Sequence, residues 1–199
     1  MDVFYRYHQM SLNATKASFR RDLISKINWT DSMIGIKGAR GVGKTTLLAQ
    51  HITESFRNDQ SALYVSMDNL AMKGMSLFEI AEQHYQSGGT HLFVDEVHKY
   101  VDWSFSLKNI YDLLPDLHIV FTGSSMLAIN KSQADLSRRA IIYDLHGLSL
   151  REFINIELGL ELPAYSLEDI LTNHLEIAQI IASQVKILKT FGEYLEIGY

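Results

Sequence analysis

The chain of 199 residues contains no cysteine and only two prolines. The missing cysteine excludes disulfide bonds and thiolate metal sites. Long apolar runs are also missing, whereas a membrane-spanning helix needs about 20 apolar residues, and residues 1–10 have no apolar stretch of the signal-peptide kind. We therefore expect a cytoplasmic protein with no membrane partner. Its 47% of hydrophobic residues are sufficient for an ordinary buried core.

An excess of positive charge is missing as well, because the formal net charge is -5. A protein dedicated to nucleic acid usually has a basic surface. The one local basic run is Lys16, Arg20, Arg21 and Lys26. We interpret it as the solvated face of a helix. Nucleic acid is therefore a partner that the charge does not support.

Short apolar runs alternate with amphipathic segments along most of the chain. We expect strands at residues 33–36, 62–65, 92–94, 118–121 and 140–145, and helices at residues 15–28, 44–57, 76–85, 104–114 and 149–158. Ser76 with Glu79, and Ser149 with Glu152, have the spacing of capping boxes. Continuous apolar strands separated by helices predict an α/β fold, with a mainly parallel sheet covered on both faces. Ligands of such a sheet bind at the carboxyl ends of its strands.

The best candidate for a domain boundary lies between Gly159 and Pro163, where a helix stop is followed by a proline turn. We expect an N-terminal helical segment at 1–30, a nucleotide-binding core at 31–160 and a helical C-terminal region at 161–199. The last region has a loose helical pattern and ends without an obvious completed element, so we expect it to be truncated.

Residues 38–45 read Gly-Ala-Arg-Gly-Val-Gly-Lys-Thr and fit the pattern G-x-x-x-x-G-K-[ST] between a predicted strand and a predicted helix. Glycines let the backbone approach a phosphate closely, and the N–H groups at the helix start then face it. Lys44 supplies a cation for the β- and γ-phosphates, and the Thr45 hydroxyl is a ligand for Mg²⁺. The pattern predicts a site for ATP with Mg²⁺. Its predicted binding residues are Gly38, Ala39, Arg40, Gly41, Val42, Gly43, Lys44, Thr45 and Thr46.

Two acidic residues, Asp95 and Glu96, follow the predicted strand at 92–94. An aspartate at this place holds the Mg²⁺ shell of a phosphate loop. A glutamate beside it can act as the base that polarises the attacking water. We predict Asp95 and Thr45 as the metal residues, and Glu96 and Lys44 as catalytic residues.

Other polar residues follow or precede the later strands. Ser124 and Ser125 end the fourth strand, where a hydroxyl either reaches the γ-phosphate or caps a helix. Arg138 and Arg139 precede the fifth strand, either as a finger for the transferring charge or as two exposed arginines. We include Ser124 and both arginines among the candidate catalytic residues. His98 completes a D-E-x-H sequence like that of some helicases, but the other helicase blocks are absent, so we interpret His98 as an ordinary loop residue.

Four blocks of this sequence together resemble the bacterial and archaeal AAA-type P-loop ATPases. They are GARGVGKTTLL at 38–48, LFVDEVHK at 92–99, FTGSSM at 121–126 and LSRRAIIYDLHGLSLREF at 136–153. The resemblance covers residues 15–160 and implies a three-layer α/β/α sandwich with a five-stranded sheet of order 5-1-4-3-2. From the residue pattern we also expect extra helices at both ends of the core.

The same resemblance implies roles for individual residues. Lys44 and Thr45 correspond to Walker A, Asp95 and Glu96 to Walker B, and Ser124 to the sensor region. Arg138 or Arg139 matches a basic position before the fifth strand. Members of the family usually continue into a C-terminal domain of unknown function, so the resemblance implies that most of this domain is missing here.

The leading hypothesis for the function is a hydrolase that couples ATP hydrolysis to a conformational change in a partner protein or an attached domain. The alternative from another class is a nucleotide-gated binding module with little turnover. A small-molecule kinase is a further alternative, with a short lid within residues 122–139. A GTPase is disfavoured because Gln133 replaces the aspartate of the guanine-reading N-K-x-D sequence that begins at Asn130.

Overall fold

The computed structural model describes residues 2–15, 19–57, 59–69, 74–124, 136 and 138–198. The chain divides into two compact units, Met1–His146 and Gly147–Tyr199. The predicted boundary at residue 160 falls inside the second unit. Residues 1–30, which we expected to form a segment of their own, belong to the first unit.

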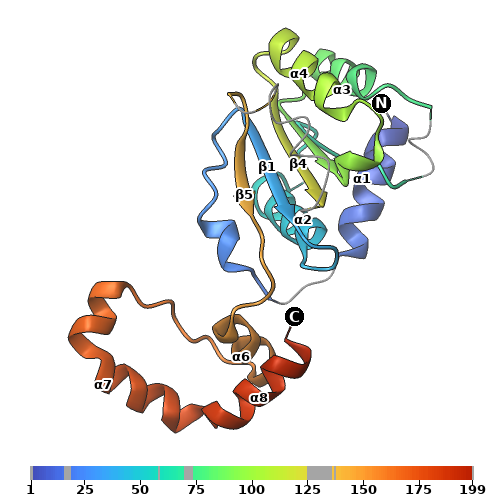
Figure 1. The fold of residues 1–199 in the computed structure, drawn as a ribbon. Helices are drawn as coiled ribbons and strands as arrows, with labels where there is room; N and C mark the ends of the chain where they lie inside the picture. Colours follow the sequence, from blue (N-terminus) through green and yellow to red (C-terminus); the bar gives the residue numbers. More distant parts are fainter. Residues whose placement is uncertain are drawn as a thin grey trace. The chain divides into compact units, whose positions relative to one another are not determined.

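The first unit is built on a sheet of five parallel strands (Figure 1). The strands are β1 (Met33–Gly38), β2 (Ala62–Ser66), β3 (His91–Asp95), β4 (His118–Ser124) and β5 (Ile141–Asp144). Their order across the sheet is β2-β3-β4-β1-β5, and every neighbouring pair is parallel. The predicted α/β fold and the predicted order 5-1-4-3-2, read from the other edge, are confirmed.

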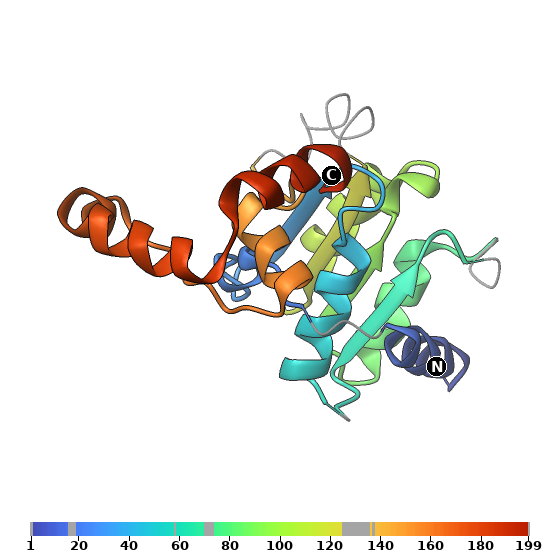
Figure 2. The same cartoon turned by 90° about the horizontal axis from the view of Figure 1, so that it is seen from below.

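Helices cover both faces of this sheet, α2 (Lys44–Ser55) on one and α3 (Leu77–Gln86) with α4 (Trp103–Leu113) on the other (Figure 2). Side chains alternate between the two faces along each strand. Leu92 and Val94 therefore pack in the hydrophobic cluster that contains α3 and α4 side chains, whereas Phe93 packs in the cluster of α2. Because both faces are buried, the strands read as continuous apolar runs.

The predicted helix at 15–28 is wrong. The chain instead forms helix α1 (Asp2–Ala14) and a short 3-10 helix (Asp22–Ser25). Helix α1 lies along β2, the edge strand of the sheet (Figure 2). The Tyr5 hydroxyl donates a hydrogen bond to the Gln60 carbonyl at 2.5 Å, and His8 Nδ1 accepts one from the Tyr64 N–H at 2.9 Å. Helix α1 thus pairs the Tyr64 N–H, a backbone group that an edge strand would otherwise expose.

The second unit is helical, as expected, with α6 (Leu150–Leu158), α7 (Leu167–Gln184) and α8 (Ile187–Ile197). The predicted capping box of Ser149 and Glu152 is confirmed at the start of α6. At Ser76 only half of the predicted box forms, in which the hydroxyl accepts the Glu79 N–H. Within the described ranges, no helix combines the length and the apolar character that crossing a membrane requires.

Three histidines of the first unit make its stability depend on pH; His8 and His51 are buried, and His91 is partly buried. Burial is the main cause that lowers the pKa of His8, His51 and His91 to about 4. In the unfolded chain a histidine has a pKa of about 6.5. Between these values the unfolded chain binds protons that the folded chain does not, so the free energy of unfolding falls as the pH falls from about 6.5 towards 4.

We therefore expect the urea midpoint of unfolding to be lower at pH 5 than at pH 7. The loss is at most about 1.4 kcal/mol per pH unit for each histidine. Equilibrium urea unfolding followed by circular dichroism at several pH values measures it. His51→Asn should flatten the dependence, whereas His174→Asn, at an exposed position of α7, should leave it unchanged. Equal midpoints at pH 5 and pH 7 would contradict this expectation.

Candidate functional site

The loop between β1 and α2 lies at the carboxyl end of the sheet. Gly41 and Gly43 have φ values of 87° and 98°, in the left-handed region that favours glycine. Gly38 is required for a different reason, because a Cβ there would overlap the Leu145 carbonyl oxygen. Helix α2 begins directly after Gly43, at Lys44. The backbone thus needs each glycine of the motif and places the first N–H groups of α2 beside the loop.

Arg21 holds this loop from outside the motif. Its guanidinium donates hydrogen bonds to the Val42 carbonyl at 2.6 Å and to the His146 carbonyl at 2.8 Å. The side chain is largely buried, so our interpretation of Arg21 as part of a solvated helix face is wrong. Arg21 joins the glycine-rich loop to the segment that follows β5. Its position in the sequence, well before the motif, carries no signal of this role.

Lys44 lies under the loop with 4% of its surface exposed. Its Nζ donates hydrogen bonds to the Gly38 carbonyl at 3.0 Å and to the Ala39 carbonyl at 2.9 Å. The same atom is 3.7 Å from Glu96 Oε1, on the other side of the site. The ammonium is therefore held by the loop and faces the predicted base.

Asp95 ends β3 and is 2% exposed. Three hydroxyls donate to its carboxylate. Thr45 Oγ1 and Tyr64 Oη both donate to Oδ2, at 2.7 Å and 2.8 Å, and Thr122 donates to Oδ1. Burial and then the nearby Asp95 raise the pKa of Tyr64, so the phenol remains a donor. Sequence reasoning predicted Asp95 and Thr45 but missed Tyr64 and Thr122, which sit in strands on either side of β3.

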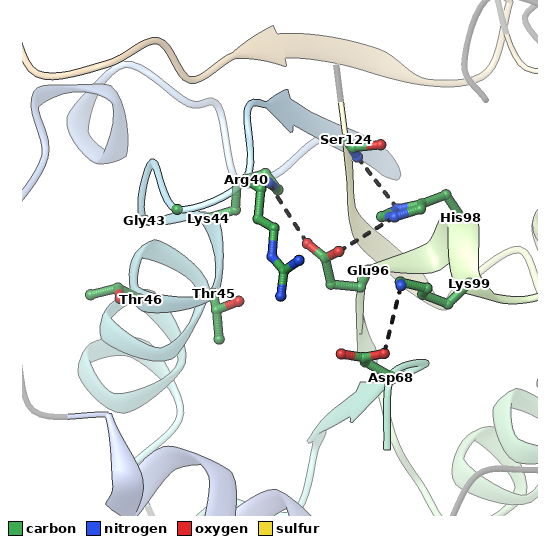
Figure 3. Close-up of a pocket in the computed structure, with 11 residues that line it drawn as sticks. Arg40, Gly43, Lys44, Thr45, Thr46, Asp68, Glu96, His98, Lys99 and Ser124 are labelled. Carbon is green, nitrogen blue, oxygen red and sulfur yellow. Dashed lines mark hydrogen bonds and ion pairs between the residues drawn. The ribbon is translucent and has the colours of Figure 1, made fainter. Parts of the chain in front are cut away.

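Glu96 follows with a backbone conformation that is rare for its residue type. Its φ of 51° is left-handed, which costs a non-glycine residue roughly 1 kcal/mol or more and is common at functional sites. The Thr122 hydroxyl accepts the Glu96 N–H at 2.9 Å. The carboxylate lies between Lys44 and His98, whose Nε2 is 3.5 Å from Oε2 (Figure 3).

His98 is part of the site, so our interpretation of it as an ordinary loop residue is wrong. Its Nδ1 accepts the Ser124 N–H at 3.4 Å, which leaves the Nε2 proton directed at Glu96. One imidazole therefore connects the end of β4 with the carboxylate after β3 (Figure 3). The contacts of His98 with Ser124 and Glu96 account for its position without any of the other helicase sequence blocks.

These side chains surround one cavity of about 530 Å³. This volume is within the range of small-molecule sites. The residues that line it are Arg40, Gly41, Gly43, Lys44, Thr45, Thr46, Asp68, Glu96, His98, Lys99 and Ser124. Figure 3 shows Arg40 extending into the space between the loop and Glu96. Most of the predicted site residues thus face one space, which Asp68 and Lys99 border with an ion pair of 3.9 Å.

Arg138 and Arg139 are not among the residues that line the cavity. Arg139 donates to the Asp112 carboxylate at 2.9 Å and 3.1 Å, and Arg138 is exposed. Both precede β5, whose first residue pairs near the start of β1. The loop follows the carboxyl end of β1, so the two arginines and the loop lie at opposite ends of the strands. Ser125 and the segment 130–133 lie outside the described residues.

The oxygen atoms of Thr45 and Asp95 suit a magnesium ion. Mg²⁺ prefers oxygen ligands and usually keeps waters, with one or two carboxylates and the substrate phosphates completing its shell. Thr45 directs its proton at Asp95, so the lone pairs of its oxygen are free to bind a cation. Within the described ranges no three His, Asp or Glu residues form a metal site of their own. The residues present therefore fit Mg²⁺ bound together with a nucleotide.

Comparison with known proteins places the chain in a family. A family model described as an AAA domain matches residues 30–154. The chain belongs to the AAA domain family. An uncharacterized protein of Methanocaldococcus jannaschii is 30% identical to this AAA domain over an alignment of 184 residues, which covers 83% of the chain and 37% of that protein.

One solved structure shows the same fold at low sequence identity. The Saccharomyces cerevisiae Hsp104-ADP complex matches with a TM-score of 0.52 and 18% identity, over 77% of this chain and 26% of that chain. Caenorhabditis elegans PCH-2 matches with a TM-score of 0.44 and 16% identity, over 84% of this chain and 48% of that chain. The chain spans 37% of the length of the Methanocaldococcus jannaschii protein. The family supports a nucleotide-binding domain of the ATPase type.

Proposed function

We propose that this AAA domain binds ATP with Mg²⁺ and hydrolyses it with Glu96 as the base. One observation carries the proposal. The Glu96 carboxylate, at the end of β3, and the Lys44 ammonium, at the start of α2, face each other 3.7 Å apart in the cavity that Thr45 also lines. A base, a cation and a metal-binding hydroxyl in one cavity are what phosphoryl transfer to water requires.

Binding rests on the loop and on the residues beneath it. The N–H groups at the start of α2 favour the negative charge of a triphosphate. Lys44 exchanges its contacts with the Gly38 and Ala39 carbonyls for phosphate oxygens. Thr45 and Asp95 hold Mg²⁺, which supplies Lewis-acid stabilisation of the phosphate charge when it is bound.

Hydrolysis rests on Glu96. When Lys44 turns to the phosphates, its pairing with Glu96 weakens and the carboxylate can accept a hydrogen bond from a water. That water then attacks the γ-phosphate in line with the leaving oxygen. Ser124 lines the same cavity, and we propose that it contacts the γ-phosphate or the water. We further propose that hydrolysis changes the conformation of an attached domain or partner protein.

A second candidate is a nucleotide-gated binding module with little turnover of its own. The observation that favours it is the absence of Arg138 and Arg139 from the cavity lining, because an arginine finger contributes strongly to phosphoryl transfer. Steady-state release of phosphate from the purified chain separates the two. Release over many turnovers supports the ATPase, and stoichiometric binding of ATP without continued release supports the module.

His98 provides a further prediction. His98 contacts Glu96 and is not part of the glycine-rich loop. His98→Ala should therefore lower kcat about 10-fold, the size expected for loss of an orienting partner. ATP affinity should stay within about 2-fold. A phosphate-release assay and an ATP titration measure the two effects. His174→Ala, at an exposed position of α7, is the control and should change neither. Equal losses of kcat and affinity would show that His98 supports the loop instead.

A further inference from the structure

We propose that Tyr64 is a positioning residue for the magnesium site. Its phenol holds the Asp95 carboxylate in the orientation in which Asp95 aligns the Thr45 hydroxyl. The inference rests on the proposed function, because it concerns the same site. It assigns a role to a strand residue that belongs neither to the glycine-rich motif nor to the acidic pair.

The first step is the geometry at one oxygen atom. Asp95 Oδ2 accepts from Thr45 at 2.7 Å and from Tyr64 at 2.8 Å, and Thr122 donates to the other oxygen. A carboxylate held at both oxygens cannot rotate without breaking hydrogen bonds in a buried place. Without the phenol, Oδ2 would keep only Thr45, which lies on the exposed side next to the cavity.

The second step concerns the Thr45 hydroxyl. A hydroxyl has one proton and two lone pairs. As long as the proton points to Asp95, the lone pairs are available to a cation in the cavity. If Asp95 rotates, the proton is no longer fixed, and the cation loses an aligned ligand. Tyr64 therefore acts on the metal through Asp95 and Thr45 without touching the metal.

The third step is that Tyr64 is itself held rigidly. Its backbone pairs with β3 on one side, where Tyr64 lies opposite Phe93, and its N–H is bonded to His8 of α1 on the other. Its ring is 4% exposed and packs in the hydrophobic cluster beneath α2. Helix α1, the edge strand and the metal-site carboxylate are thus connected through one residue.

A buried phenol also needs a hydrogen-bond partner for stability alone, and a purely structural role has different consequences. A structural role would change folding stability and affect nucleotide binding equally with and without Mg²⁺. A positioning role changes mainly the part of the affinity that depends on Mg²⁺. The two roles therefore differ in a measurement that does not need catalytic turnover.

The test is Tyr64→Phe, which removes the hydroxyl and keeps the ring. Its control is Tyr143→Phe, because the Tyr143 ring packs against the same cluster and its hydroxyl bonds the Asn28 N–H, away from Asp95. Binding of a fluorescent ATP analogue is titrated in EDTA and then against Mg²⁺. We expect Tyr64→Phe to raise the half-saturating Mg²⁺ concentration about 10-fold, as for other residues that orient metal ligands. Affinity in EDTA should stay within about 2-fold.

An unchanged Mg²⁺ dependence, or an equal loss with and without Mg²⁺, would overturn the proposal for Tyr64. Failure of the proposed function is recognised separately, because the unmodified chain would then bind no ATP or would bind it without regard to Mg²⁺.

Discussion

Replacing Lys44 by alanine is expected to weaken ATP binding at least about 100-fold. The ammonium is a buried cation at the loop, and in the proposed function it is the group that turns to the β- and γ-phosphates. Hydrogen bonds to charged groups are each worth roughly 1.5–3 kcal/mol, and two of them correspond to a factor of about 10² or more in affinity. Calorimetric titration with ATP and Mg²⁺ measures the loss.

Lys99→Ala is the matched control for Lys44→Ala. Lys99 lines the same cavity, but it is half exposed and its Nζ lies 3.9 Å from Asp68. An exposed pair of this kind contributes at most about 1 kcal/mol, so ATP affinity should change by less than about 5-fold. Equal effects of the two lysines would mean that the general charge of the cavity, and not the loop, determines binding.

Replacing Glu96 by glutamine is expected to lower the turnover of ATP at least about 100-fold, the usual contribution of a general base. The amide keeps the size of the side chain and leaves the backbone hydrogen bond to Thr122 in place. It also removes the negative charge that competes for Lys44, so ATP affinity should be equal or slightly higher. Phosphate release and ATP titration on the same preparation measure both quantities.

Asp68→Asn is the control for Glu96→Gln, because it removes a carboxylate from the same cavity without touching Lys44. Its turnover should remain within about 3-fold of the unmodified chain. If Glu96→Gln retained full turnover, Glu96 would not be the base, and the hydrolytic part of the proposed function would fail. If both variants lost turnover equally, the charge of the cavity would be the cause.

The core of the site could be predicted because its signals are local in the sequence. The pattern at residues 38–45 needs only neighbouring residues to define a glycine loop and a helix start. The five strands could be predicted because burial on both faces leaves uninterrupted apolar runs. Asp95 and Glu96 follow one of these strands, so their place at the carboxyl edge follows from the parallel sheet. The strand order came from the resemblance of the four blocks to the AAA-type ATPases.

The supporting residues could not be predicted because their contacts connect distant parts of the chain. Arg21 contacts the loop and the end of β5, and Tyr64 and Thr122 reach Asp95 from neighbouring strands. A tyrosine in a buried strand looks like any core residue until the sheet is assembled. Helix α1 was missed for the same reason, since its contacts with the edge of β2 leave no periodic pattern that identifies them.

The same limit applies to the residues before β5. The spacing of Arg138 and Arg139 marks a basic position, but it does not say at which end of the strands the two arginines lie. In the structure, the start of β5 lies at the amino ends of the strands, away from the loop, and Arg139 pairs with Asp112. Their role as catalytic arginines therefore stays a prediction, and one that the chain's own cavity does not favour.

A crystal structure of the Glu96→Gln chain grown with ATP and Mg²⁺ tests the central claim most directly. The account predicts a triphosphate under the loop, with Lys44 Nζ on the phosphates and Mg²⁺ on Thr45 Oγ1 beside Asp95. A nucleotide bound elsewhere, or a loop that stays without phosphate at saturating ATP, would contradict it.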